Sequence, residues 1–247
     1  MRRLASASQA AVESRTSERG VVDDGGGDFD ASWPTEGPIR LIRLAENRGK
    51  GAAVRAGIQA ARGLVHVFTD VDVPYELDLI PTAVAYVLER GFHVVLGDRT
   101  LPGSRYLVDL GLARRIASRI FMVFVGRLVT GGFFDTQCGF KAFRADVAQQ
   151  LFGVGRLERF AFDVELVYMA LIHRLDVKRV PVRLRHNEGS SIRLLRDSSQ
   201  MLFDVLRLKW NRSRGRYAAP ALEAIPGADF AVVRAEVGGR VRERASP

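Results

Sequence analysis

The sequence has little of what builds disulfide scaffolds, zinc clusters and membrane spans. One Cys in 247 residues excludes an internal disulfide framework and a Cys-based zinc site, and it favours a reducing, cytosolic compartment. The four His show no ligand spacing. No run reaches the roughly 18 apolar residues that a bilayer span needs, since the best candidate, 120–129, is interrupted by Arg127. Residues 1–20 lack the apolar stretch of a secretory signal and predict a solvated, flexible leader.

Charge of one sign is in excess. Lys and Arg number 37 against 28 Asp and Glu, which gives a formal net charge of +9, and only four of the 37 are Lys. An anionic partner follows from this balance, and the planar Arg fork suits phosphate oxygens. We find no helix-turn-helix or RNA-binding signature, so the charge is not attributed to nucleic acid binding. With 47% hydrophobic and 26% charged residues, the composition is that of a folded globular protein.

Hydrophobic periodicity predicts strands that alternate with helices. We expect strands over 39–44, 64–69, 93–96, 139–143 and 177–184, and helices after Asn47, over 78–90, 106–129, 162–173 and about 194–210. Alternation of this kind is typical of an α/β protein with a mostly parallel sheet flanked by helices. We place a single domain over 21–210, followed by a flexible tail over 211–247.

Two aspartates one residue apart are the most informative candidates for chemistry. Asp70 and Asp72 follow a continuous apolar run, at the strand end where an open α/β sheet places its ligand. Their carboxylates can reach a common hard cation such as Mg²⁺ or Mn²⁺, which would neutralise a diphosphate leaving group. A pattern this short also occurs by chance in caps and turns.

Two further motifs precede these aspartates. VVDDG at 21–25 reads as the end of a strand with Asp23 and Asp24 before a glycine turn. NRGKG at 47–51 opens a helix, where backbone amides and Lys50 could approach a nucleotide phosphate. Val54 stands at the third glycine position of the dinucleotide fingerprint, so that fingerprint is not met.

In chain order, VVDDG, NRGKGAAVRAG, FTDVD, GDR, DTQCGFKAF, AFDVEL, VPV and EGSSI resemble the family 2 glycosyltransferases of the Rossmann-like GT-A fold. The pair DTQCGFK and FDVEL carries most of the specificity. Within the family, the sequence is most similar to dolichyl-phosphate β-glucosyltransferases, with polyprenyl-phosphate mannosyltransferases further away. The resemblance covers about residues 21–210.

The resemblance implies roles for ten residues. Asp70 and Asp72 would hold Mg²⁺ or Mn²⁺ against the nucleotide-sugar diphosphate, and Asp23, Asp24 and Lys50 would lie at the nucleotide pocket. The acceptor phosphate would be held by Arg99, Arg114, Arg115 and the Ser190 loop, while Asp135 would line the sugar and acceptor pocket. The expected catalytic residues are Asp72, Arg99 and Asp135.

The function that the resemblance implies is inverting transfer of a hexose, glucose from UDP-glucose, to a polyprenyl phosphate. GDP-mannose-dependent transfer and a non-catalytic nucleotide-sugar-binding remnant stay as alternatives. A lipid acceptor implies a peripheral enzyme at the cytosolic membrane face, and the basic amphipathic segments 106–129 and 194–210 could either lie at that interface or pack on the sheet.

The sequence departs from the family at its start. The first strand and its P-x-Y-N-E turn are missing before Val21, and Gly26-Gly27 replaces the usual Ser-Thr. We therefore expect a domain that is incomplete at its N-terminus, either a truncated reading frame or a degenerate member.

Overall fold

A computed structural model describes residues 17–26, 39–70, 75–106, 123, 126, 129, 135–184, 194–223 and 225, with the side chains of 194–202 left aside. The strands are β1 (Arg19–Asp23), β2 (Ile39–Arg43), β3 (Val65–Phe68), β4 (Val94–Asp98), β5 (Arg105–Tyr106), β6 (Lys141–Arg144), β7 (Val177–Pro181) and β8 (Arg183–Leu184). The helices are α2 (Lys50–Ala60), α3 (Leu79–Leu88), α5 (Ala145–Val154), α6 (Phe162–Ile172), α7 (Leu194–Ser213) and α8 (Pro220–Glu223).

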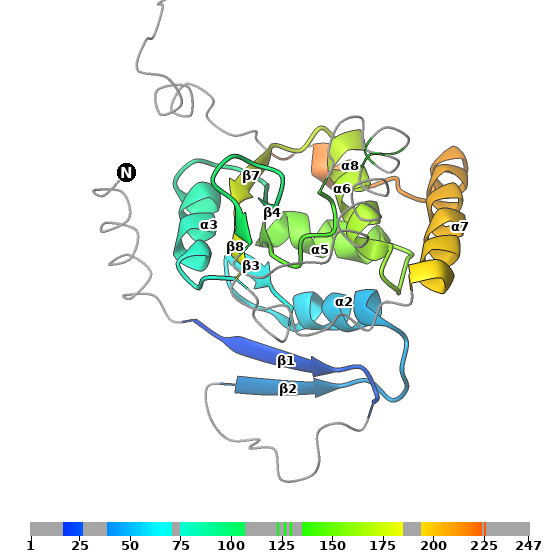
Figure 1. Ribbon diagram of the computed structural model, residues 1–247, viewed down its shortest axis with the longest axis horizontal. Helices are drawn as coiled ribbons and strands as arrows, with labels where there is room; N and C mark the ends of the chain where they lie inside the picture. The colour runs from blue at the N-terminus through cyan, green and yellow to red at the C-terminus, as the bar shows by residue number, and fades with distance from the viewer. Residues whose placement is uncertain are drawn as a thin grey trace, which may run out of the picture.

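A four-stranded sheet with the order β3-β6-β4-β7 forms the centre of the fold (Figure 1). β3, β4 and β7 run in one direction, as the mostly parallel sheet of the prediction requires. β6 lies between β3 and β4 and runs antiparallel to both. The segment that leads into β6 therefore enters the sheet at the edge where β3 and β4 end.

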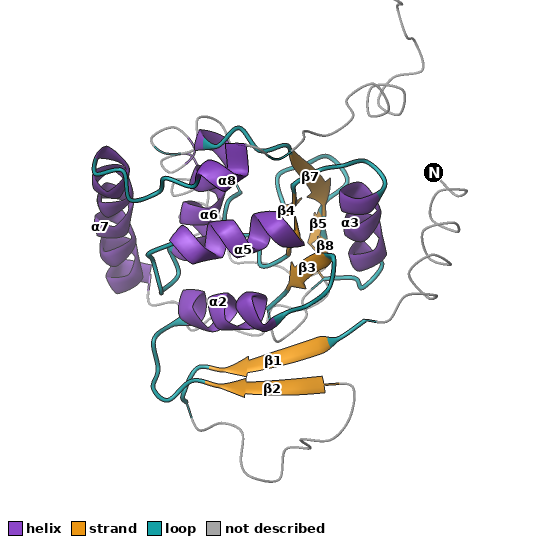
Figure 2. Cartoon of the chain, turned by 180° about the vertical axis from the view of Figure 1, so that it is seen from behind, coloured by secondary structure: helices purple, strands orange, loops and turns teal. Residues whose placement is uncertain are grey.

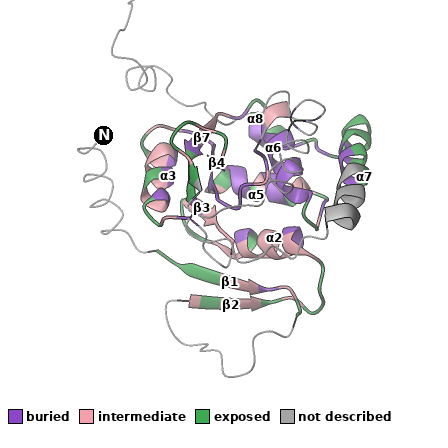
Figure 3. Ribbon diagram, viewed as in Figure 1, coloured by how far each residue is buried: buried purple, intermediate pink, exposed green. Residues whose placement is uncertain are grey.

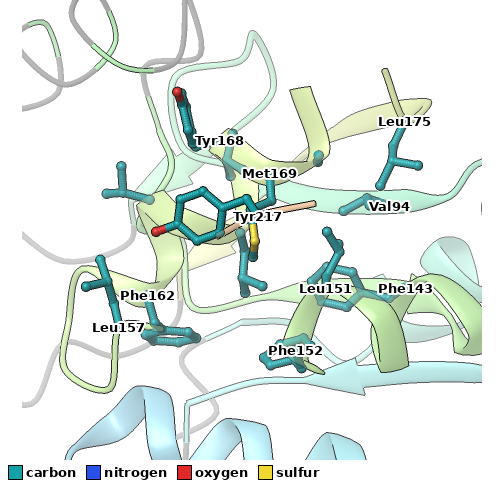
Figure 4. Close-up of a cluster of buried hydrophobic side chains, with 14 of the residues drawn as sticks. Val94, Phe143, Leu151, Phe152, Leu157, Phe162, Tyr168, Met169, Leu175 and Tyr217 are labelled. Atoms are coloured by element: carbon teal, nitrogen blue, oxygen red, sulfur yellow. The ribbon is translucent and has the colours of Figure 1, made fainter. Parts of the chain in front are cut away.

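The two faces of this sheet are covered by different helices. Side chains alternate along β4, so that Val95 packs with α3 on one face while Val94 and Leu96 pack on the other. That second face carries the larger core, to which α5 and α6 contribute most (Figure 4). α6 is buried around its whole circumference from Phe162 to Ala170, as its purple ribbon in Figure 3 shows. Apart from Asp163 and Glu165, which are paired with Lys141 and Tyr217, its residues are apolar around the helix, and such a helix requires this central position.

A separate parallel pair, β1 and β2, lies on the far side of α2 (Figure 2). α2 packs on β1 through Gly57, where an added Cβ would stand 3.0 Å from Val22 Cγ2. Its Ile58 belongs to the large core. α2 thus joins the β1–β2 pair to the main sheet.

The folded part of the chain extends beyond residue 210, where the sequence analysis begins a flexible tail. α7 continues to Ser213, and Tyr217 and Leu222 are each 2% exposed. Tyr217 packs edge-on against Tyr168, with ring centroids 6.4 Å apart. Both side chains are labelled in Figure 4. The Tyr217 hydroxyl donates to Glu165 Oε1 at 2.6 Å. The placement of the tail from 211 is therefore wrong for 211–223, because an aromatic and an aliphatic side chain there complete the core.

Most of the other predicted strands and helices lie where they are predicted. The strand predicted over 177–184 is divided into β7 and β8, which belong to different sheets, and β5 is not predicted. β1 begins at Arg19, within the leader predicted over 1–20. Nothing in the sequence analysis predicts α5, although it supplies four buried residues to the core. The residue that precedes α2 as its N-cap is Gly49, at a φ of 103°, and not Asn47. The helix predicted over 106–129 falls almost wholly outside the described residues.

Candidate functional site

One edge of the main sheet gathers three of the described candidates, Asp70, Arg99 and Asp135. Asp70 follows the end of β3 and Arg99 follows the end of β4. Because β6 is antiparallel, the segment 135–140 arrives at the same edge, and Gly97 N donates to Phe140 O at 3.0 Å. Three segments distant in the sequence therefore meet where the sequence analysis expects a ligand.

Asp70 meets a cation on one side and a glycine on the other. Its Oδ1 lies 2.6 Å from Lys50 Nζ at the start of α2, an ion pair in which both side chains are about one-third exposed. This oxygen is itself buried, and among the described residues it has no partner with hydrogen-bond geometry. A Cβ added to Gly139 would stand 2.0 Å from Asp70 Oδ2. Glycine at 139 is thus what leaves room for the carboxylate.

Buried side chains hold the turn that carries Gly139 in place. Gly139 N donates to Tyr75 Oη at 3.0 Å. Lys141 Nζ donates to Cys138 O at 2.8 Å and pairs with Asp163 Oδ1, and Lys141 and Asp163 are 1% and 3% exposed. Burial raises the pKa of the Cys138 thiol to about 11, so Cys138 is a protonated packing residue. The ion pair connects the DTQCGFK and FDVEL motifs directly.

Arg99 and Asp135 form a bidentate ion pair. Asp135 Oδ2 accepts from Arg99 N at 2.7 Å and from Arg99 Nε at 2.8 Å, and Oδ1 accepts from Nη2 at 2.6 Å. Burial alone would raise the pKa of Asp135, but the hydrogen bonds and charge of Arg99 outweigh it and hold that pKa below its ordinary value. Asp135 is therefore an ionised acceptor rather than a proton carrier, and it fixes a guanidinium whose side chain is still 25% exposed.

A second pair lies beside the first. Asp98, 2% exposed, accepts from Thr100 N at 2.7 Å, from Thr100 Oγ1 at 2.6 Å and from Arg179 Nε at 2.5 Å. Arg179 comes from β7, the parallel neighbour of β4. Two adjacent strands thus present guanidinium groups at one edge, each anchored by a buried aspartate. The sequence analysis misses Arg179, because its partner Asp98 becomes evident only when the strands are paired.

Asp23 and Asp24 shape the loop before α2. Asp24 accepts from Arg48 N at 2.9 Å and from Gly49 N at 2.7 Å, while Asp23 accepts from Gly26 N at 3.2 Å. Asp24 accepts from both of these amides, and their approach to a phosphate stays a prediction. Asp24 thereby fixes the loop that places Lys50 beside Asp70.

The glycines of that loop serve close packing. A Cβ at Gly49 would stand 2.8 Å from Glu158 O, and one at Gly51 would stand 2.7 Å from Phe162 Cβ. The loop therefore seats α2 against the start of α6. Contacts then run continuously from Asp24 through Lys50 to Asp70.

Four predicted site residues lie outside the described residues, namely Asp72, Arg114, Arg115 and Ser190. Within the part that is described, no three His, Cys, Asp or Glu side chains gather as a metal cluster would. Asp70 Oδ1 is buried and faces a cation, the Lys50 ammonium at 2.6 Å, and a carboxylate oxygen in this setting fits one position in the ligand shell of a hard divalent cation. No helix of the described residues has the length and apolar character to cross a bilayer.

Comparison with known proteins agrees with the motifs. Residues 11–152 match the family described as Glycosyl transferase family 2. A dolichyl-phosphate beta-glucosyltransferase of Dictyostelium discoideum is 32% identical over 201 residues, covering 77% of this chain and 62% of the relative. Proteins of the same name from Drosophila melanogaster and Homo sapiens are 34% and 30% identical, covering 62% and 70% of this chain. The chain spans about half to three-fifths of the length of these curated relatives.

Solved structures share the fold at low identity. Glucosyl-3-phosphoglycerate synthase from Mycobacterium tuberculosis, in complex with Mn²⁺ and UDP-glucose, aligns with a TM-score of 0.53 at 16% identity. The alignment covers 84% of this chain and 82% of the synthase chain. Mannosyl-3-phosphoglycerate synthase from Rubrobacter xylanophilus aligns with a TM-score of 0.51 at 18% identity, covering 86% and 70%. These alignments confirm the predicted GT-A fold.

Proposed function

Because the chain belongs to glycosyl transferase family 2, we propose that it transfers glucose from UDP-glucose to a polyprenyl phosphate of the dolichyl type. The relatives named dolichyl-phosphate beta-glucosyltransferase support this choice of donor and acceptor. The observation that carries the proposal is the edge formed by Asp70 and Arg99, where a carboxylate suited to a cation and a guanidinium suited to a phosphate meet.

The donor side is built around Asp70. Asp70, together with Asp72, would hold Mg²⁺ or Mn²⁺, which when bound supplies charge neutralisation for the leaving diphosphate. The protein complexed with Mn²⁺ and UDP-glucose has the same fold and supports a divalent cation here. Lys50, already within ion-pair distance of Asp70, adds a positive charge for the same phosphates. Asp23 and Asp24 act by shaping the loop at the nucleotide side.

The acceptor side is built around Arg99, with Arg114, Arg115 and Ser190 as further contacts to the acceptor phosphate. A phosphate monoester has a second pKa of about 6, so it is largely a dianion at neutral pH and can attack the anomeric carbon without losing a proton. Asp135 is consistent with this chemistry, because its pKa is held low and it offers no basic site. Its role is to orient Arg99.

Catalysis then rests on placing two anions in line. Arg99 compensates the charge of the nucleophile while the donor-side cations compensate that of the leaving group. Displacement from one face inverts the anomeric centre and gives a β-linked glucosyl phosphate from an α-linked donor. A lipid acceptor places this reaction at a membrane surface, on the cytosolic side where nucleotide sugars are available.

A transfer assay tests the proposal. The purified chain is incubated with a short polyprenyl phosphate, Mn²⁺ or Mg²⁺, and labelled UDP-glucose or GDP-mannose, and the lipid product is separated and identified by mass. We expect glucosyl transfer from UDP-glucose. Product from GDP-mannose alone would assign the mannosyltransferase alternative, and UDP binding without turnover in any combination would assign the non-catalytic one.

Matched variants locate the activity. Asp70→Asn removes one carboxylate charge at the site, and Asp146→Asn makes the same change at the opposite edge of the sheet, beyond the end of β6. We expect Asp70→Asn to lose transfer by about 100-fold or more, as for a displaced catalytic group, and Asp146→Asn to keep it. Equal activity in the two variants would remove Asp70 from the mechanism.

A further inference from the structure

The outward side of α7 carries large apolar side chains. Phe203, Leu206 and Trp210 are 63%, 59% and 46% exposed. At about 100° per residue, positions i, i+3 and i+7 of a helix fall within about 60° of one another, so they form a single stripe. Val205 and Leu208, at 2% and 0% exposed, bind α7 to the core on the other side. We call Phe203, Leu206 and Trp210 the outer stripe.

The sequence analysis treats 194–210 as a basic amphipathic segment, which implies a single apolar face. The structure shows two apolar faces on this helix, because Leu206 belongs to the exposed outer stripe whereas Val205 and Leu208 are buried on the opposite side. An exposed apolar stripe on a basic helix is uncommon on a purely structural element and indicates an interaction surface. In Figure 3 the described turns of α7 are exposed along their outer side.

Cations border the outer stripe on both sides. By helical position, Arg207 lies about 40° beyond one border and Lys209 about 60° beyond the other, and both are exposed. At the C-terminal end, Arg214 and Arg216 hold their guanidinium carbons 4.1 and 4.7 Å from the centre of the Trp210 ring. Apolar groups along the middle with cations at the rim are therefore fixed features of this surface.

The charge of this segment indicates which kind of partner would bind the outer stripe. Residues 203–216 contain five Arg or Lys and one acid, Asp204, which is buried at 7% exposure. A second copy docked by two-fold symmetry would bring the same cations against one another. An anionic bilayer instead accepts the apolar stripe at its acyl boundary and the cations among its phosphates, with Trp at the interface.

We propose that the outer stripe of α7 and its bordering cations form a docking surface for an anionic lipid membrane. The choice of a bilayer rests in part on the proposed lipid acceptor, which must reach the enzyme from a membrane. The binding itself needs neither nucleotide sugar nor acceptor. Failure of binding and failure of transfer are therefore separate results.

Vesicle binding tests this surface in the full chain. The chain carries two Trp, so a Trp33→Phe background leaves Trp210 as the single fluorescent reporter. It is titrated with vesicles of phosphatidylcholine alone and of phosphatidylcholine with phosphatidylglycerol. We expect binding to the anionic vesicles, a blue shift of Trp210 emission, and quenching by lipids brominated near the headgroup.

Two sets of variants separate the stripe from its rim. Phe203→Ser with Leu206→Ser should weaken binding to anionic vesicles about tenfold or more, because two apolar side chains no longer enter the bilayer. Arg207→Gln and Lys209→Gln should each weaken it about fivefold and reduce its salt dependence. Leu64→Ser with Leu77→Ser is the matched control, since these leucines are 71% and 61% exposed elsewhere and should leave binding unchanged.

Three results would overturn the proposal. They are absence of binding to anionic vesicles, equal binding by the stripe variant and its control, and a wild-type dimer in light scattering that the stripe variant converts to a monomer. The last would assign the surface to a second copy of the chain. Circular dichroism of each variant checks that α7 is retained.

Discussion

A single methyl group added at Gly139 should disable the site while leaving the fold in place. In Gly139→Ala, the new Cβ would stand 2.0 Å from Asp70 Oδ2 and 2.5 Å from Asp70 Cγ. No Cβ tolerates such distances, so the carboxylate must turn away. The obstructing atoms belong to the end of a side chain rather than to the backbone, which lets Asp70 move without unfolding the sheet.

The two consequences differ greatly in size. The Lys50–Asp70 ion pair is lost, but both side chains are about one-third exposed, and pairs of this kind contribute about 0.2–1 kcal/mol. Stability should therefore fall by about 1 kcal/mol or less from this loss. Transfer should fall far more, by about 100-fold, because a catalytic group is displaced by more than an ångström.

The assay compares transfer rates with thermal unfolding of the same preparation. Gly153→Ala is the control, because no atom outside its own stretch of helix lies within 4 Å of its added Cβ. That variant should keep full activity and gain slightly in stability, as a helical glycine replaced by alanine does. If Gly139→Ala transfers at the wild-type rate, or loses activity only because it unfolds, the contact between Gly139 and Asp70 has no functional role.

Three further results are expected. Arg99→Lys should raise the KM for the acceptor phosphate about 10-fold or more and leave the KM for the donor unchanged. The reason is that lysine cannot form the two bonds by which Asp135 orients the Arg99 guanidinium. Equal changes in both KM values would contradict this. Arg99 holds the pKa of Asp135 below its ordinary value of 3.8, against the effect of burial, so the ionised carboxylate stabilises the fold at pH values above 3.8. This stabilisation is lost as the pH falls below 3.8 toward the lowered pKa. Asp135→Asn should lack this part of the acid unfolding, which circular dichroism follows. Lys141→Met should cost about 3–5 kcal/mol in urea unfolding by stranding the buried charge of Asp163, and Lys141→Met with Asp163→Leu should recover part of it.

The sequence predicts those parts of the fold that depend on local pattern. The strand-forming run at 65–68 lies just before Asp70, and the apolar runs that become β4 and α6 give their positions directly. α5 escapes prediction because ADVAQQLFGV mixes strand-forming and helix-forming residues and has no side-chain N-cap. The burial of Tyr217 is not predicted either, since it depends on Tyr168 and Glu165, which are distant in the sequence.

The candidate site divides in the same way. The residue pattern and the resemblance to a family name Asp70, Arg99 and Asp135 as candidates, but they give these residues no partners. That Asp135 holds Arg99 follows only when the antiparallel β6 brings residue 135 to the end of β4. The need for glycine at 139 likewise depends on the arrival of Asp70 from β3.

Calorimetric titration with UDP-glucose tests the claim that Asp70 holds a divalent cation for the donor diphosphate. Wild-type chain and Asp70→Asn are each titrated in Mn²⁺ and in EDTA. The wild type should bind UDP-glucose at least about tenfold more tightly in Mn²⁺ than in EDTA, whereas Asp70→Asn should bind it weakly and with the same affinity in both conditions. An Asp70→Asn variant that keeps the metal dependence of the wild type would contradict the account.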